Sequence, residues 1–253
     1  MLSLNFMTSL LTIPAQSESP ESGMAFDEAL FLHVISENKL DPIIRFYEFK
    51  QPSITIGFGQ RKLEFENLNG NASWTRRPTG GGLVAHEHDL IVCFIAPLAL
   101  HPEFSSPKRS YAIIHKLIQN ALKRFQIDTD FHISCRNEDY NPDPMVCFKR
   151  PICDDLMFRG TKVAGGAQKR SQGYLLHQES IQLGSLEKLG FLIEKTEFQK
   201  VLVLEFEQFF EWKISERMIP EDVLRVASDL TENKYKQPEW KLKGRLDSLQ
   251  MVS

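Results

Sequence analysis

The sequence has few cysteines, no excess of charge of one sign and no long apolar run, and each absence excludes a class of protein. Four cysteines occur in 253 residues without a Cys-x-x-Cys pair or a zinc-type histidine spacing, so we expect reduced thiols and no metal site. The net charge of −3 gives no general reason to expect nucleic-acid or membrane binding. No apolar run reaches bilayer-spanning length, and no basic residue precedes Lys39, which argues against a signal peptide. We therefore expect a cytoplasmic protein.

The order of apolar patterns predicts an α+β fold, with a mixed, largely antiparallel sheet flanked by helices. The composition, 42% hydrophobic and 25% charged, is ordinary for a globular domain. A turn-rich connector is expected at 15–23. We predict a main domain over 1–190 and a C-terminal helical extension over 191–253, packed on the same domain. The expected helices are 24–38 and 111–125, and the expected strands are 43–48, 53–56, 90–95, a hairpin of 156–158 with 161–164, and one or two strands within 174–183.

The first segment that indicates chemistry is the run Arg76–His86, RRPTGGGLVAH. Three consecutive glycines remove every Cβ from a bend, so that backbone N–H groups can approach a ligand and bind anionic oxygens. The two arginines add delocalised charge with a geometry suited to phosphate or carboxylate. A Walker loop is excluded because the Gly-Lys-Ser/Thr ending is missing. A glycine triplet alone could be a plain loop, but its combination with Arg-Arg favours a binding site.

The second segment is Gly160–Gln168, GTKVAGGAQ, in which Lys162 precedes a small-residue stretch in an expected strand. A lysine beside accessible backbone can place a charge on a carbonyl or phosphate oxygen. Taken alone, the segment equally fits an exposed strand lysine followed by a turn, which is the more common situation.

Read together, the two segments resemble the lipoate–protein ligase and octanoyltransferase superfamily, which is related to biotin–protein ligases. RRPTGGGLVAH is similar to its arginine and glycine signature, and GTKVAGGAQKR with LLHQESI resembles its second block. The stretches 23–30, 52–57 and 230–240 are similar to other elements of that family, so the resemblance covers most of the chain.

This resemblance implies that the chain attaches an acyl group to a lysine of a lipoyl carrier domain. The carrier would be a glycine cleavage H protein or the E2 lipoyl domain of a 2-oxoacid dehydrogenase. Lys162 would polarise the acyl carbonyl or contact an acyl phosphate. The residues implied to bind the acyl group or a nucleotide are Arg76, Arg77, Thr79, Gly80, Gly81, Gly82, His86, Gly165, Gly166, Ala167 and His177.

Two mechanisms are compatible with the resemblance. A ligase would activate lipoate or octanoate with ATP and Mg²⁺ and pass the acyl-adenylate to the carrier lysine. A transferase would need no cofactor, because it would take octanoyl from a thioester donor and hold it on a cysteine. Cys147, followed by Phe148 and preceding Pro151, resembles the nucleophile of cysteine octanoyltransferases, although most cysteines are simply small core residues. We place the ligase first by a small margin.

One residue departs from the pattern of the family. Glu179 stands where relatives commonly have glycine, and a carboxylate there could crowd a tight turn or repel a phosphate. A relative that binds the carrier without catalysis is therefore a third possibility.

Overall fold

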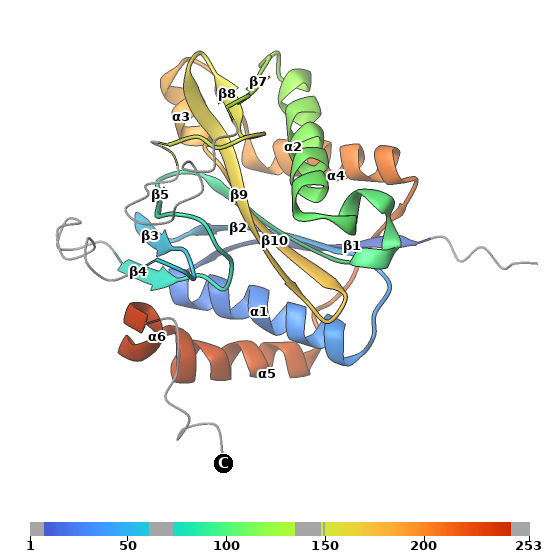
Figure 1. Cartoon of the computed structure of the whole chain (residues 1–253), viewed down its shortest axis with the longest axis vertical. Coiled ribbons are helices and arrows are strands. Elements are labelled where there is room, and N and C mark those ends of the chain that lie inside the picture. The colour runs from blue at the N-terminus through green and yellow to red at the C-terminus, as the bar shows by residue number, and fades with distance from the viewer. Residues whose placement is uncertain (1–7, 61–72, 135–147, 149, 244–253) are drawn as a thin grey trace, which may run out of the picture.

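The centre of the computed structural model, which describes residues 8–60, 73–134, 148 and 150–243, is an eight-stranded sheet (Figure 1). The order of strands is β11-β1-β2-β6-β10-β9-β8-β7, and β1 pairs in parallel with β2 and β11 while the other pairs are antiparallel. This confirms the predicted mixed, largely antiparallel sheet. The strands are β1 (Ser9–Glu18), β2 (Ile43–Phe49), β6 (Leu90–Pro97), β7 (Asp130–Phe131), β8 (Leu156–Phe158), β9 (Thr161–Ser171), β10 (Tyr174–Ile181) and β11 (Lys213–Glu216).

A second sheet of three strands lies beside the large one. Its order is β4-β3-β5, formed by Ser73–Arg76, Ser53–Ile56 and Val84–His86. Strand β3 pairs in parallel with β4 and antiparallel with β5, so the glycine-rich turn between β4 and β5 is held at the edge of this small sheet.

Helices cover both faces of the large sheet. Helices α1 (Pro20–Ser36) and α5 (Glu221–Leu230) lie side by side on one face, and α2 (Pro107–Arg124) and α4 (Lys195–Phe210) cover the other (Figure 1). The shorter elements are α3 (Leu183–Lys188), α6 (Pro238–Lys243) and the helical turns η2 (Leu98–Leu100), η3 (Pro102–Ser105) and η6 (Thr231–Tyr235). None of the helices in the described ranges is long and apolar enough to cross a membrane.

The sheet divides the core into two hydrophobic clusters, and β6 contributes to both. Its residues Val92 and Phe94 pack under α2 and α4, while the alternate residues Ile91, Cys93 and Ile95 pack under α1. A strand that is covered on both faces reads as a continuous apolar run, which is why Leu90–Ile95 shows no alternation in the sequence.

Helices α1 and α2 begin about one turn before their predicted starts because of their caps. The hydroxyl of Ser106 accepts a hydrogen bond from the N–H of Arg109, and Pro107 occupies the first turn. Likewise Ser19 caps α1 by accepting from the N–H of Ser22. The expected connector at 15–23 is therefore divided between the end of β1 and the first turn of α1.

Candidate active site

The side chain of Lys162, from the start of β9, is almost completely buried and forms an ion pair. Its Nζ lies 2.6 Å from Oδ2 of Asp155, and the two side chains are 3% and 0% exposed. The same carboxylate accepts hydrogen bonds from the hydroxyl of Tyr111 at 2.5 Å and from the N–H of Ile152 at 2.7 Å. The ring of Phe148 lies over the amine, with its centroid 5.0 Å from Nζ. These contacts hold a cation at one fixed place, as electrostatic catalysis requires.

Two glycines of the second predicted segment make room for charged groups. A Cβ on Gly165 would lie 2.4 Å from Nζ of Lys162, and a Cβ on Gly166 would lie 2.3 Å from Oε2 of Glu179. Both distances are shorter than real Cβ contacts, so a side chain at either position would displace the charged group beside it. Lys162 therefore lies across its own strand, directly over Gly165.

A cavity beside Lys162 lies between the large sheet and the three-stranded sheet. Its walls come from α1, the glycine-rich turn and strands β3, β5, β6, β9 and β10. The lining residues are Met24, Thr55, Arg77, Gly81, Val84, His86, Ile91, Ile152, Lys162, Gly165, Gly166, Ala167, Gln178, Glu179 and Ser180. A second hollow shares Gly81, Ile152, Gly166 and Ala167 with it, and adds Gly80 and Tyr111. The two predicted segments, 80 residues apart in the sequence, thus meet at one site.

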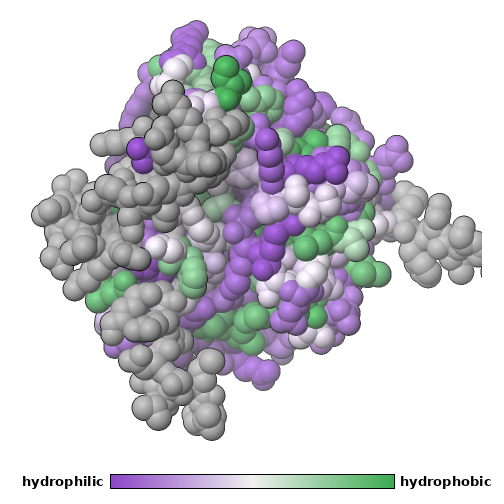
Figure 2. All heavy atoms as spheres, in the orientation of Figure 1, coloured by the Kyte–Doolittle hydropathy of each residue, from purple (hydrophilic) through white to green (hydrophobic). Residues whose placement is uncertain are grey.

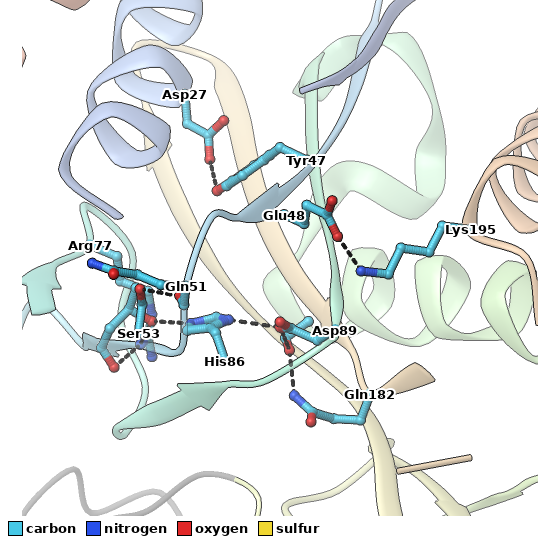
Figure 3. Close-up of polar contacts among 12 residues, drawn as sticks. Asp27, Tyr47, Glu48, Gln51, Ser53, Arg77, His86, Asp89, Gln182 and Lys195 are labelled. Atoms are coloured by element: carbon cyan, nitrogen blue, oxygen red, sulfur yellow. Dashed lines mark hydrogen bonds and ion pairs between the residues drawn. The ribbon is translucent and has the colours of Figure 1, made fainter. Parts of the chain in front are cut away.

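Several polar side chains of this wall form hydrogen bonds with one another. His86 bonds to Oγ1 of Thr55 at 2.8 Å through Nε2 and to Asp89 at 2.7 Å through Nδ1 (Figure 3). The hydroxyl of Ser180 donates to the same Asp89 carboxylate at 2.5 Å. Burial alone would raise the pKa of Asp89, but His86 and these hydrogen bonds bring that pKa below its ordinary value.

The side chain of Gln178 is also held in place by contacts with its neighbours. Its carbonyl oxygen accepts from Thr79 at 2.7 Å, and its amide donates to Asp27 at 2.6 Å and contacts the sulfur of Met24 at 3.3 Å. With their polar atoms engaged by neighbours, these residues leave mainly carbon facing the cavity. Such a lining suits an aliphatic chain.

The two predicted arginines direct their hydrogen bonds at backbone carbonyls. Arg77 lines the cavity and donates to the carbonyls of Thr55, Gly80 and Gly82. Arg76 is 1% exposed and joins β4 to the turn after β3 and to the C-terminal helix. The carbonyl groups that accept from Arg76 belong to Gly57, Phe58, Gln60, Trp240, Lys241 and Leu242. In this arrangement the guanidinium group of Arg77 shapes the glycine-rich turn, whereas that of Arg76 connects the turn after β3 to the C-terminal helix.

The sequence suggested that Glu179 lies in a tight turn, but the structure places it in a strand. It lies in the middle of β10, and its Oε2 is 2.9 Å from Nε2 of both His115 and His177, all three side chains being fully buried. These atoms are close enough to one another to suggest a metal site. The hydrogen bonds around His177 indicate otherwise.

The amide of Gln168 is oriented by its Oε1, which accepts from Ser110 at 2.9 Å, so its NH₂ group faces Nδ1 of His177 at 3.2 Å. Nδ1 is then an acceptor and Nε2 carries the proton, which it donates to Glu179. Burial lowers the pKa of His177, consistent with a neutral ring. Burial would also lower the pKa of His115, but Glu179 raises it above the ordinary value. The cluster is therefore explained by a carboxylate that accepts from Nε2 of His115 and from Nε2 of neutral His177.

We expect Glu179→Gln to remove a measurable part of the acid sensitivity of the fold, to which Asp89 and Glu28 also contribute through lowered pKa values. Burial would raise the pKa of Glu179, but His115 and His177 lower it to about 2 from 4.5. A depressed acid pKa stabilises the fold above pH 4.5, and this contribution, about 3 kcal/mol, is lost as pH falls toward 2. Urea unfolding at pH 7 should show the variant destabilised by about that amount, with a flatter loss between pH 5 and 3. Equal pH dependence of the two proteins would contradict the assignment, and the exposed Glu197→Gln serves as control.

Of the other predicted residues, Gly80, Gly81 and Ala167 line the two hollows, and the carbonyl of Gly82 accepts from Arg77. Cys147 lies outside the described residues. Cys93 is buried and free, whereas Cys153, which lines the second hollow, is disulfide-bonded, in contrast to the expected reduced thiol.

Asp155, Tyr111, His115 and Asp89 were not predicted as site residues. The pattern of helix 111–125 contained a usable signal for two of them, because Tyr111 and His115 share a helical face with the apolar Ile118. A polar residue on a buried face usually has a buried polar partner.

The face of the molecule drawn in Figure 2 is mostly hydrophilic among its described residues, and the hydrophobic residues of this face form small separate groups.

Comparison with known proteins gives consistent matches. The model of a family described as the lipoyl protein ligase A/B catalytic domain matches residues 19–201. Octanoyltransferase LipM of Bacillus subtilis (strain 168) is 34% identical over 180 residues, which are 68% of this chain and 64% of that protein. Octanoyltransferase LipM of Anoxybacillus flavithermus is 29% identical over 265 residues, which are 89% of this chain and 95% of that protein. A bi-partite lipoate protein ligase from Thermoplasma acidophilum, described together with its E2 lipoyl domain, shares the fold. The TM-score is 0.69 at 20% sequence identity, and the match covers 96% of this chain and 99% of that one.

Proposed function

Since the chain belongs to the lipoyl protein ligase A/B catalytic domain family, we propose that it transfers an octanoyl group from a thioester donor to a lysine of a lipoyl carrier domain. Cys147 would hold the acyl group between the two transfers. The observation that carries this proposal is the position of Phe148, the residue after Cys147, over the amine of Lys162. The octanoyltransferases among the relatives support the same choice.

The proposed reaction has two steps at one carbonyl carbon. The thiolate of Cys147 attacks the thioester, a new C–S bond forms as the donor's C–S bond breaks, and the donor leaves as a thiolate that takes a proton from solvent. The neutral amine of the carrier lysine then attacks the acyl-cysteine, an amide forms as the C–S bond breaks, the amine proton passes to solvent, and the Cys147 thiolate is released. Lys162 stabilises the negative charge that develops on the carbonyl oxygen in both steps.

ATP-dependent ligation, the first choice from the sequence alone, becomes the second candidate. That choice rested on the superfamily, in which ligation is the more common activity, and on a dense set of basic residues that includes Arg76 and Arg77. Both arginines direct donors to backbone carbonyls, which weakens the second of these arguments. Glu179 no longer motivates a non-catalytic relative, because its carboxylate is paired inside the sheet and crowds no turn.

Mass spectrometry of a lipoyl carrier domain distinguishes the candidates. The carrier is incubated with the protein and either an octanoyl thioester without ATP, or octanoate or lipoate with MgATP, under reducing conditions because Cys153 is disulfide-bonded. We expect octanoylation from the thioester alone, abolished in Cys147→Ser and retained in Cys93→Ala, a free buried cysteine used as control. Labelling only with MgATP would establish a ligase. Labelling under neither condition would leave carrier binding as the function.

A further inference from the structure

The floor of the cavity is a row of residues that crosses three strands in register. Gly165 on β9 is paired with Ser180 on β10, and Ser180 with Ile91 on β6. Directly paired residues of neighbouring strands point to the same face, so the three line the same side of the sheet, and all of them border the cavity. The row continues to Tyr47 on β2, which does not border it.

The side chains in this row grow in the direction away from Lys162. Gly165 has none, Ser180 has a hydroxyl that is directed to Asp89, and Ile91 has a branched chain that is 2% exposed. Beyond it the ring of Tyr47 is fully buried, and its hydroxyl donates to Asp27 at 2.8 Å. The floor is therefore open at one end and filled from Ile91 onward.

The adjacent row on the same face ends in the same way. Ala167 and Gln178 border the cavity, whereas the next positions, Cys93 and Arg45, are buried outside it. Arg45 is held there by ion pairs with Asp27 and Glu18. A chain that follows the floor thus cannot continue past β6.

The length of the open row matches an eight-carbon chain. Lys162 places its amine over Gly165, which fixes the position of the acyl carbonyl at β9. From β9 to β6 are two strand spacings, about 10 Å. An extended octanoyl chain, with carbon–carbon bonds of about 1.5 Å, spans about 9 Å. The end of such a chain reaches Ile91.

We infer that Ile91 is the stop that sets the acyl-chain length accepted by this site. The inference rests on the proposed acyl transfer and adds to it the residue that selects medium-chain substrates. Met24 of α1 borders the cavity from the side opposite the floor, so the chain is enclosed between helix and sheet. Shortening Ile91 extends the floor toward Tyr47 and admits a longer chain.

The experiment compares acyl thioesters of six, eight, ten and twelve carbons on wild type, Ile91→Ala and Ile95→Ala. Ile95 lies on the same strand, in the same core cluster and on the same face, but does not border the cavity. Ile95→Ala therefore removes the same amount of core packing as Ile91→Ala without changing the cavity. Ile91→Ala is expected to raise the decanoyl-to-octanoyl ratio of kcat/KM by about tenfold, because two further methylene groups become buried. Ile95→Ala should leave that ratio at the wild-type value.

An unchanged ratio in Ile91→Ala, with octanoyl transfer intact, would overturn the inference and leave the proposed function standing. Wild type that transfers none of the four chains would instead overturn the proposed function and the inference with it. Should Ile91→Ala not fold, Ile91→Val, one methyl group smaller, is expected to shift the ratio in the same direction by about threefold. An equal shift in Ile95→Val would show that general loosening of the core, and not Ile91, sets the length.

Discussion

Lys162→Met is expected to lower kcat/KM for octanoyl transfer by about 10³-fold, because it removes a buried cation that borders the acyl cavity close to Phe148 while keeping most of the side-chain volume. The loss should appear mainly in kcat, since a charge that forms on the carbonyl oxygen exists only in the transition state. Single-turnover formation of the octanoyl carrier measures it directly. Activity within tenfold of wild type would remove Lys162 from the proposed mechanism.

The same substitution leaves Asp155 buried without its cation, which costs about 3–5 kcal/mol of stability. Loss of activity by unfolding must therefore be separated from loss of chemistry. The double variant Lys162→Met with Asp155→Asn removes both charges, and the amide can still bond to Tyr111 or Ile152. We expect its urea midpoint to recover most of the loss while its activity stays as low as that of the single variant.

Arg76→Ala is expected to lower the free energy of unfolding by about 4 kcal/mol, because backbone carbonyls from two parts of the chain lose their donors at once. Arg76→Lys should recover only part of this, since an ammonium group cannot donate in the planar fork geometry of a guanidinium. Urea unfolding gives the energy. Hydrogen exchange of residues 231–243 should show the C-terminal turns exchanging faster in Arg76→Ala.

The exposed Arg225 of α5 provides the matched control for Arg76. It belongs to the same C-terminal segment and carries the same charge, yet it lies on the surface. Arg225→Ala should change stability by less than about 0.5 kcal/mol. A loss below about 1 kcal/mol for Arg76→Ala would mean that the C-terminal segment is held mainly by other contacts, such as the hydrogen bond from Trp240 to the carbonyl of Arg76.

The regular parts of the fold were predictable because local patterns agree with the tertiary environment. The hairpin of β8 and β9 turns at Arg159 and Gly160, both at positive φ, as the Arg-Gly pair indicated. Residues 174–181 form one strand, β10, which was one of the two alternatives. The family resemblance drawn from the arginine and glycine motifs is confirmed by the family match.

Other elements could not be read locally. The end of β1 is a polar Gln-Ser-Glu stretch that resembles a connector, and it becomes a strand only because β2 offers paired backbone beside it. Strand β11, Lys213–Glu216, lies in a region of helical pattern and is likewise defined by its pairing with β1. Such pairings depend on contacts far apart in the sequence, which propensity does not contain.

The functional site likewise has features that could be predicted from local sequence and features that depend on contacts between distant residues. Lys162 and the glycines could be found from their spacing, but the role of Gly166 depends on Glu179, thirteen positions later, and on the register of β9 with β10. The two arginines were recognised as important, while the direction of their side chains was not readable. An arginine beside a glycine-rich turn can serve a ligand or the turn itself, and only the carbonyls around it decide between them.

The contact of Arg76 with residues 240–242 also has a consequence for the order in which the protein matures. The partners are 164 to 166 positions apart. At a synthesis rate of about 5–20 residues per second, Arg76 therefore leaves the ribosome about 8–33 s before the carbonyl groups of residues 240–242 are made. During that interval its buried guanidinium group lacks these acceptors. Docking of the C-terminal turns against β4 is thus one of the last events in folding.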